Sequence, residues 1–158
     1  MKQIEMMDMS FGMEWSDEYL LGYSDMDVVH KEFVRLVNNI LICPDSHLNE
    51  ALEQFSVHAV SHFKEEDQMM LNTDFPASEC HLDEHAAVMT SLKEVIQELR
   101  LGNVAIARAF AKELASWFPR HSTHLDSVLA HWMFRREHGG APIVLKRLNT
   151  FQKFNTPV

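Results

Sequence analysis

Four segments of the chain repeat apolar residues at steps of three and four positions, and this periodicity constrains the fold more than any other feature. Such spacing places apolar residues on one face of an α-helix, which then packs against other helices. The segments cover about residues 25–42, 46–72, 77–101 and 103–137. Because the breaks between them are short, consecutive helices are expected to run in opposite directions. The sequence therefore predicts an all-α protein, an antiparallel up-down-up-down four-helix bundle with an N-terminal arm (1–24) and a C-terminal tail (139–158).

The residues at the breaks predict where individual helices begin and end. Ser46 and Asn103 are expected to cap the second and fourth helices, because their side chains can accept a hydrogen bond from a free backbone N–H. Gly102 is expected to follow the end of the third helix. We expect residues 1–138 to form one domain and residues 139–158 to be a tail or a linker.

Six polar residues interrupt the apolar stripes of the four segments. They are His30, His62, Glu66, His81, His85 and His121. An imidazole or carboxylate that is buried without a partner destabilises a fold, so buried charges are normally paired or bound to a metal. The distances of these residues from the shared breaks differ by at most four residues, or about 6 Å at about 1.5 Å per residue. We therefore expect one polar layer across the bundle.

The donor types and spacings in this layer predict a metal site. The pairs His62/Glu66 and His81/His85 are each four residues apart, so each pair shares one helical face. Imidazole and carboxylate donors without thiolate suit iron, manganese or zinc better than an iron–sulfur cluster. A ferritin-like di-iron oxidase would need two Glu-x-x-His steps and a zinc hydrolase a His-Glu-x-x-His motif, and the sequence contains neither. The remaining alternative is a bundle whose histidines are incidental.

Asp126 is a further candidate ligand that lies off the stripe. It follows His121 by five residues, which is about 140° around a helix of about 3.6 residues per turn. It can reach the polar layer only if the helix is irregular or tilted there. Pro119 provides a reason for irregularity, because it cannot donate a hydrogen bond to the carbonyl of Ala115. Beyond His121 the stripe itself is expected to continue through Leu125, Val128 and Trp132.

Five other histidines are expected to lie mostly on the surface. They are His47, His58, His124, His131 and His138. His58 precedes His62 by one turn and is an alternative ligand, although Ala59 occupies the core position beside it. His124 lies one turn from His121 and could contact this candidate ligand without binding the metal itself.

The order and spacing of the candidate ligands resemble the ligand set of the bacterial hemerythrins. The matching positions are His30, His62, Glu66, His81, His85, His121 and Asp126. Further matching positions are Trp15, Asp27 three residues before His30, Asn38, Phe63, Glu65, Met69 and Trp117. The resemblance covers about residues 15–129, nearly all of the predicted folded part.

This resemblance implies a centre of two non-haem iron ions with an oxo or hydroxo bridge and with O2 as ligand. One iron would bind three histidines and the other two, and both carboxylates would bridge. The three-histidine set is His81, His85 and His121, the two-histidine set is His30 and His62, and the carboxylates are Glu66 and Asp126. The iron with two histidines would keep an open position for reversible O2 binding.

The resemblance also implies an O2 pocket next to the iron with two histidines. Its expected residues are Phe63, Trp117, Phe118 and Ser122. The family commonly has leucine and isoleucine at the positions of Phe118 and Ser122. If Ser122 points at the pocket, its hydroxyl would admit water or donate a hydrogen bond; the alternative is that it faces the first helix or bonds a local carbonyl.

Composition narrows the class of function. The formal net charge of −9 and the lack of a Lys/Arg run argue against a nucleic-acid partner. The N-terminus has no signal-peptide core and no stretch of about 18 apolar residues occurs, so we expect no membrane insertion and a cytoplasmic location. Cys43 and Cys80 form no Cys-x-x-Cys pair and are expected to be free thiols.

No catalytic acid, substrate pocket or flavin motif is apparent in the sequence. The favoured function is therefore reversible O2 binding for sensing, storage or delivery, and not enzymatic turnover. The alternative is a di-iron oxidoreductase, such as an oxidase, a peroxidase or a nitric-oxide-handling enzyme. The tail would also suit a connection to a signalling domain or a partner protein.

Overall fold

The structure is a computed structural model that describes residues 12–147. The helices are α1 Ser24–Ile42, α2 Leu48–Asn72, α3 Ser78–Arg100, α4 Val104–His121 and α5 Ser127–His138. A π-helical segment, Ser122–Asp126, joins α4 to α5, and short 3-10 helices span Asp17–Tyr19 and Asp45–His47. No strand occurs among the described residues. Residues 1–11 of the predicted arm and 148–158 of the predicted tail lie outside the described part of the chain.

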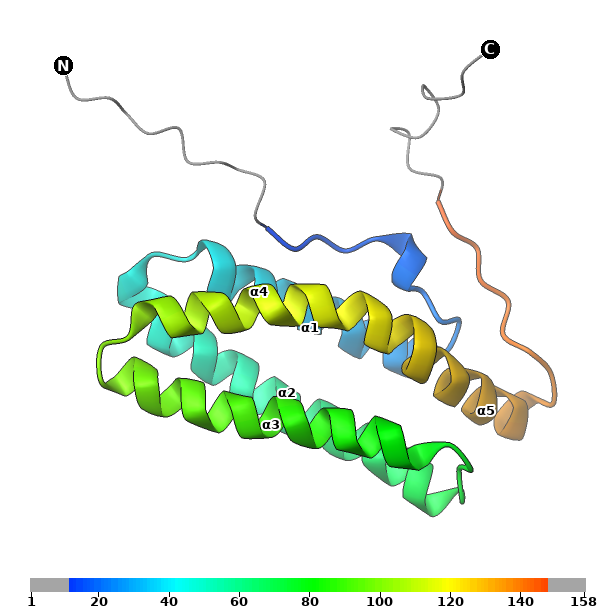
Figure 1. The fold of residues 1–158 in the computed structure, drawn as a ribbon. Coiled ribbons are helices and arrows are strands. Elements are labelled where there is room, and N and C mark those ends of the chain that lie inside the picture. Colours follow the sequence, from blue (N-terminus) through cyan, green and yellow to red (C-terminus); the bar gives the residue numbers. More distant parts are fainter. Residues whose placement is uncertain (1–11, 148–158) are drawn as a thin grey trace, which may run out of the picture.

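The helices form a square bundle in which α1 packs on α2 and α4, and α3 packs on the same two neighbours. Short connections join α1 to α2, α2 to α3 and α3 to α4, and each of these helices runs opposite to the one before it (Figure 1). The π-helical segment and α5 extend α4 as the fourth member of the bundle (Figure 1). The predicted all-α four-helix bundle is confirmed.

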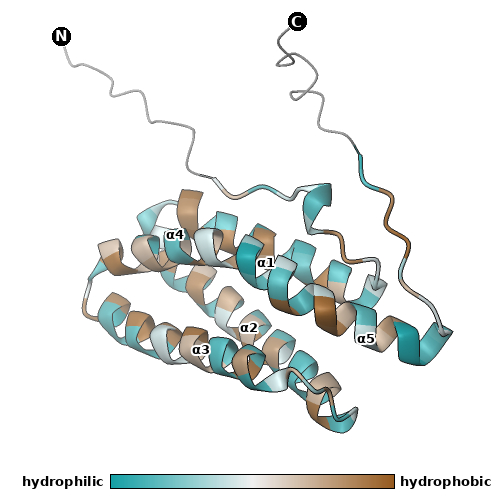
Figure 2. Cartoon of the chain, turned by 45° about the vertical axis from the view of Figure 1, so that its right-hand side comes forward, coloured by the Kyte–Doolittle hydropathy of each residue, from teal (hydrophilic) through white to brown (hydrophobic). Residues whose placement is uncertain are grey.

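The buried apolar side chains form two clusters, with the polar layer between them. Along α1, for example, Met26 belongs to one cluster, His30 follows one turn later, and Phe33 belongs to the other. The buried residues of α3 are the six that its stripe predicts, namely His81, His85, Val88, Leu92, Val95 and Leu99. Hydrophobic and hydrophilic residues alternate along each helix, as expected of helices with one buried face (Figure 2).

The helix ends match two of the three cap predictions. Asn103 accepts a hydrogen bond from a backbone N–H in the first turn of α4 at 3.3 Å, and Gly102 has a left-handed φ of 91°. The cap predicted at Ser46 is wrong, because the chain forms a 3-10 turn there before α2 begins. The Ser46 hydroxyl instead contacts the ring of His47 at 3.2 Å.

Arg108 ties α4 to the connection between α1 and α2. Its guanidinium donates hydrogen bonds to the backbone carbonyls of Ile40 and Cys43 and to the Asp45 carboxylate, the last two at 2.6 Å. These carbonyls have no N–H partner within the helix, because helix ends leave them free. The side chain of Arg108 therefore closes the C-terminal end of α1.

The π-helical segment shifts the buried stripe of the fourth helix by one residue. The prediction that Leu125 and Val128 continue the stripe is wrong, whereas Trp132 is partly buried and packs against the smaller apolar cluster. The structure instead buries Asp126, Leu129 and Ala130. In a π-helix the backbone N–H bonds to the carbonyl five residues earlier, as the N–H of Ser127 does with Ser122, so one extra residue enters the turn. The extra residue turns Asp126 toward the core.

The N-terminal arm lies against α1 and α4 and is contacted by the tail. The Tyr19 ring packs edge-on against Phe118, with centroids 5.4 Å apart. The Asp27 carboxylate accepts hydrogen bonds from two backbone N–H groups of the arm, at 2.8 and 3.1 Å. From the tail, Arg147 donates a hydrogen bond to Asp17 at 2.9 Å. The arm thus covers the part of the bundle that contains His30.

The remaining structural expectations concern membranes and thiols. None of the described helices is both long and apolar enough to cross a membrane. Cys43 and Cys80 form no disulfide; Cys80 lies on the surface and Cys43 is partly buried.

Candidate metal centre

All seven predicted ligands meet in one buried cluster at the centre of the bundle. Every one of the four bundle members contributes, and no side chain in the cluster is more than 4% exposed. The residues are His30 from α1, His62 and Glu66 from α2, His81 and His85 from α3, His121 from α4 and Asp126 from the π-helical segment.

The Glu66 carboxylate divides the histidines into two sets. Its Oε1 lies 3.1 Å from His30 Nε2 and 2.9 Å from His62 Nε2. Its Oε2 lies 3.4 Å from His81 Nε2 and 3.3 Å from His85 Nε2. Each oxygen of this carboxylate therefore faces a different set of imidazoles.

Asp126 makes the same division from the opposite helix. Its Oδ2 lies 3.3 Å from His30 Nε2. Its Oδ1 lies 2.9 Å from His81 Nε2 and 3.1 Å from His121 Nε2. The cluster thus has a two-histidine half and a three-histidine half, and each carboxylate offers one oxygen to each half.

The contacts inside the cluster suit metal ligands better than hydrogen-bonded partners. His81 Nε2, Glu66 Oε2 and both Asp126 oxygens are buried and lie close to other donor atoms, yet none has a partner in hydrogen-bond geometry. The Nε2 atoms of His85 and His121 are only 3.2 Å apart. Lone pairs that converge in this way fit shared ions, and nitrogen and oxygen donors without thiolate fit iron.

Two groups of side chains could each hold an ion, because their donor atoms lie within 4.8 Å of one another. One group consists of Glu66, His81, His85, His121 and Asp126. The other consists of His30, His62 and Glu66. Two ions bridged by a carboxylate therefore fit the donors better than one.

Burial and charge together shift the pKa values of the clustered side chains. Burial opposes ionisation of Glu66, but the charge of His62 and contacts with neighbouring imidazoles hold the pKa of Glu66 well below its usual range. Burial likewise opposes protonation of His81, yet contacts with Asp126 and Glu66 raise its pKa to about 9. The pKa of His30 is raised by the same two carboxylates against the effect of burial. The two carboxylates thus stabilise positive charge on the neighbouring imidazoles, and they would stabilise bound cations in the same way.

Two carboxylates behind the cluster were not identified from the sequence. Asp67 Oδ1 lies 2.7 Å from His85 Nδ1, and Glu84 Oε2 lies 2.5 Å from His121 Nδ1. Such acceptors orient a ligating imidazole and fix which nitrogen bears the proton. Their positions next to Glu66 and His85 in the chain were the available signal, but Glu65 adjoins Glu66 as well, and Asp83 lies two residues before His85.

The four predicted pocket residues lie around both halves of the cluster. Phe63 stacks on His85 with ring centroids 4.2 Å apart, and Trp117 stacks on His121 at 4.1 Å. Phe118 packs edge-on against His30 at 5.3 Å. Ser122 is buried, and its hydroxyl has no hydrogen-bond partner. The local carbonyl bond considered for Ser122 is therefore not made.

The other histidines lie outside the cluster. His58 is partly buried beside His62, at 5.3 Å between rings, and burial followed by the His62 charge lowers its pKa to about 4. His47, His124, His131 and His138 are exposed. His124 is therefore not the support for His121 that its sequence position suggested.

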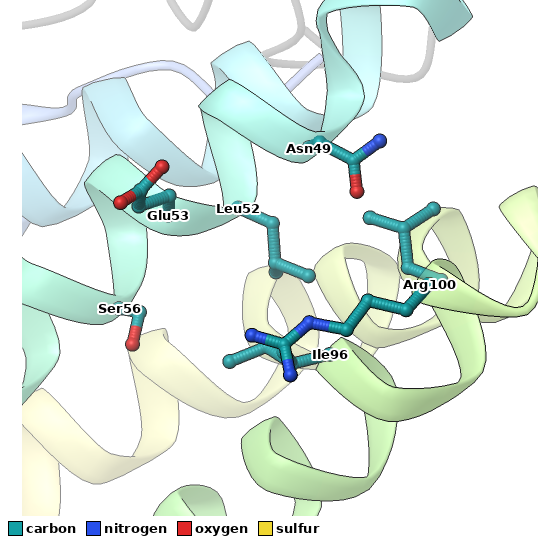
Figure 3. Close-up of a pocket in the computed structure, with 7 residues that line it drawn as sticks. Asn49, Leu52, Glu53, Ser56, Ile96 and Arg100 are labelled. Carbon is teal, nitrogen blue, oxygen red and sulfur yellow. The ribbon is translucent and has the colours of Figure 1, made fainter.

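A surface pocket lies between α2 and α3, away from the cluster (Figure 3). It is lined by Asn49, Leu52, Glu53, Ser56, Ile96, Leu99 and Arg100. The pocket lies at the N-terminal end of α2 and the C-terminal end of α3, whereas the candidate ligands lie toward the other end of each helix. None of the seven clustered side chains lines it.

Comparison with known proteins gives one family. The family model described as Hemerythrin HHE cation binding domain matches residues 21–133. A bacteriohemerythrin from Ralstonia nicotianae is 32% identical over 124 residues, which cover 78% of this chain and 90% of that protein. Bacteriohemerythrins from Aquifex aeolicus and Stenotrophomonas maltophilia are 27% and 22% identical, over 70% and 78% of this chain and 88% and 87% of their own lengths. The comparison with solved structures gave no match.

Proposed function

Because the chain belongs to the hemerythrin family, which implies a non-haem di-iron centre of the O2-binding type, we propose that its seven clustered side chains bind two iron ions and that it binds O2 reversibly. The observation that carries this proposal is the division of both carboxylates between two sets of imidazoles. A carboxylate in that position would hold both ions and balance part of their charge.

The two halves of the cluster would have different tasks. The three-histidine half, with two carboxylate oxygens, offers five donors to its ion, whereas the two-histidine half offers four. An ion with fewer protein donors keeps an open position, and that is where a small ligand binds. When bound, the iron pair supplies the electrons that hold O2 reversibly. The residues around His30 would exclude bulk water, with Phe118 and Tyr19 between this ring and the surface.

Replacing Glu66 or His121 by alanine should abolish stable loading of two iron ions. The Glu66 change removes one donor oxygen from each half, the His121 change removes one imidazole donor, and both leave a buried space in the cluster. Glu65→Ala is the matched control, because Glu65 is exposed one position away on the same helix. Iron content per chain, measured after purification, checks the assignment. Full occupancy in the Glu66 or His121 variant would refute it.

Mixing the reduced, iron-loaded protein rapidly with O2 tests reversible binding. A binding protein should give a long-lived visible absorption band that disappears when O2 is removed. The alternative, a di-iron oxidoreductase, is supported by the buried polar groups of Ser122 and His58 next to the two-histidine half. Rapid decay of the band with release of H2O2 or oxidation of an added substrate would favour that alternative.

Sensing, storage and delivery are distinguished by what the chain contacts in the cell. We propose a sensing role as the first to test, because the tail contacts the arm, and the arm in turn packs against Phe118 next to His30. Proteolysis of the iron-loaded protein with and without O2 would test this. A tail cleaved at the same rate in both states would leave storage or delivery as the function.

A further inference from the structure

Ser122 has a buried hydroxyl that nothing in the described structure uses. The residue is 1% exposed, and its Oγ has no hydrogen-bond partner. Outside the seven clustered residues, the other buried and unpartnered polar side-chain atoms in the described part of the chain are Trp15 Nε1 and His58 Nε2. Both belong to residues that are only partly buried. A fully buried polar atom without a partner is uncommon and calls for a physical explanation.

The neighbours of Ser122 along the helix locate this hydroxyl. Phe118 lies one turn before it and Asp126 one turn after it, and residues at this separation share a helical face. Both neighbours contact the same imidazole. The Phe118 ring lies 5.3 Å from the His30 ring, and Asp126 Oδ2 lies 3.3 Å from His30 Nε2. Ser122 therefore lies at the level of the two-histidine half, between Phe118 and Asp126 along the helix.

Apart from His58, whose ring lies 5.3 Å from that of His62, the described surroundings of this half are mainly aromatic. Phe33 packs against both His62 and Phe118, at 5.8 and 5.0 Å between ring centroids. These rings can exclude water, but they offer no strong hydrogen-bond donor to a polar ligand. A serine hydroxyl can donate one hydrogen bond, and burial strengthens it because water does not compete.

We propose that Ser122 is a specificity-determining residue that donates a hydrogen bond to a small anionic ligand in the two-histidine half of the cluster. This inference rests on the proposed di-iron function. Ligands whose outer atom accepts a hydrogen bond would be favoured over ligands that bind only through the metal. The unpartnered Oγ is then a donor kept for the ligand.

Azide, a small anion that accepts hydrogen bonds, is a suitable probe with the oxidised, iron-loaded protein. Ser122→Ala should weaken azide binding about tenfold, because a hydrogen bond to a charged group is lost. Ser122→Cys keeps a weak donor of similar size and should give an intermediate affinity. Ser116→Ala is the control, since Ser116 is exposed on α4, the helix that leads into the π-helical segment, and this variant should bind azide as the unchanged protein does.

Thermal unfolding of the iron-loaded protein without azide provides the second readout. Because Ser122 Oγ makes no hydrogen bond within the protein, Ser122→Ala should leave the midpoint unchanged or raise it. A lowered midpoint together with unchanged azide affinity would mean that the hydroxyl serves the backbone, and it would overturn the proposal. Equal azide affinities for Ser, Cys and Ala at normal iron content would also overturn it. Failure of the unchanged protein to bind iron would instead refute the proposed function.

Discussion

Glu84 should control how tightly the three-histidine half of the cluster holds its iron. Its Oε2 lies 2.5 Å from His121 Nδ1 and accepts a second hydrogen bond from Trp117 Nε1 at 3.1 Å. Glu84→Gln keeps the shape but removes the charge, and charge-assisted hydrogen bonds are about twice as strong as neutral ones. Loss of such a partner weakens metal binding about 10- to 100-fold. Because this carboxylate is 43% exposed, we expect the lower end, about tenfold or about 1.4 kcal/mol.

Competition with a graded series of chelators measures this effect for each iron equivalent. In Glu84→Gln one iron equivalent should be removed by chelators whose affinity for iron is about tenfold lower than the unchanged protein requires. The affinity for the second iron equivalent should change less. Asp83→Asn is the matched control, because Asp83 is the exposed neighbour of Glu84 on α3 and its replacement changes the net charge equally. If both variants lose iron alike, the effect is one of overall charge. Unchanged affinity in Glu84→Gln would refute the positioning role.

Two further predictions concern stability and pH. Arg108→Ala should lower the free energy of unfolding by about 2 kcal/mol, because two partly buried carbonyls lose a charged donor. Denaturant titration should show a change of less than about 0.5 kcal/mol for Arg35→Ala, whose ion pair is exposed. Burial and the hydrogen bond to Glu137 raise the pKa of Tyr23 from 10.0 to about 12. The stability from this contact should therefore be complete below pH 10 and disappear as the pH rises through 12. Ultraviolet titration should show one tyrosine ionising near pH 12, and Tyr23→Phe should remove that step. Ionisation of Tyr23 near pH 10 would contradict the prediction.

The bundle was predictable because its buried faces are continuous in the sequence. On α3 the six stripe positions and the six buried residues are the same. The start of α2 was not predictable, because Ser46 has the side chain of a cap, whereas the chain turns there through a 3-10 helix. Local preference favours a cap, but the path from α1 to α2 is also set by contacts with Arg108 on α4. Such contacts between distant residues are invisible to periodicity.

The cluster was partly predictable for the same reason. Six of its members lie on apolar stripes, where a polar residue stands out, and the structure brings these six together. Asp67 and Glu84 lie off the stripes and are partly exposed, so their types and positions resemble those of ordinary surface carboxylates. Only the geometry distinguishes them, because each meets the outer nitrogen of a clustered imidazole.

Asp126 shows how one irregular turn connects the sequence to the site. Pro119 predicts an irregularity, and one exists, but it begins at Ser122 while Pro119 itself remains within α4. π-helical turns are rare and less favourable than α-helical ones, so other contacts must stabilise this segment. Asp126 provides them, because its carboxylate lies between His30 and the three-histidine half only when the extra residue is present. The same extra residue moves Leu129 and Ala130 into the smaller apolar cluster. The irregular turn and the cluster therefore stabilise each other, and binding of metal at Asp126 would hold the π-helical turn in place.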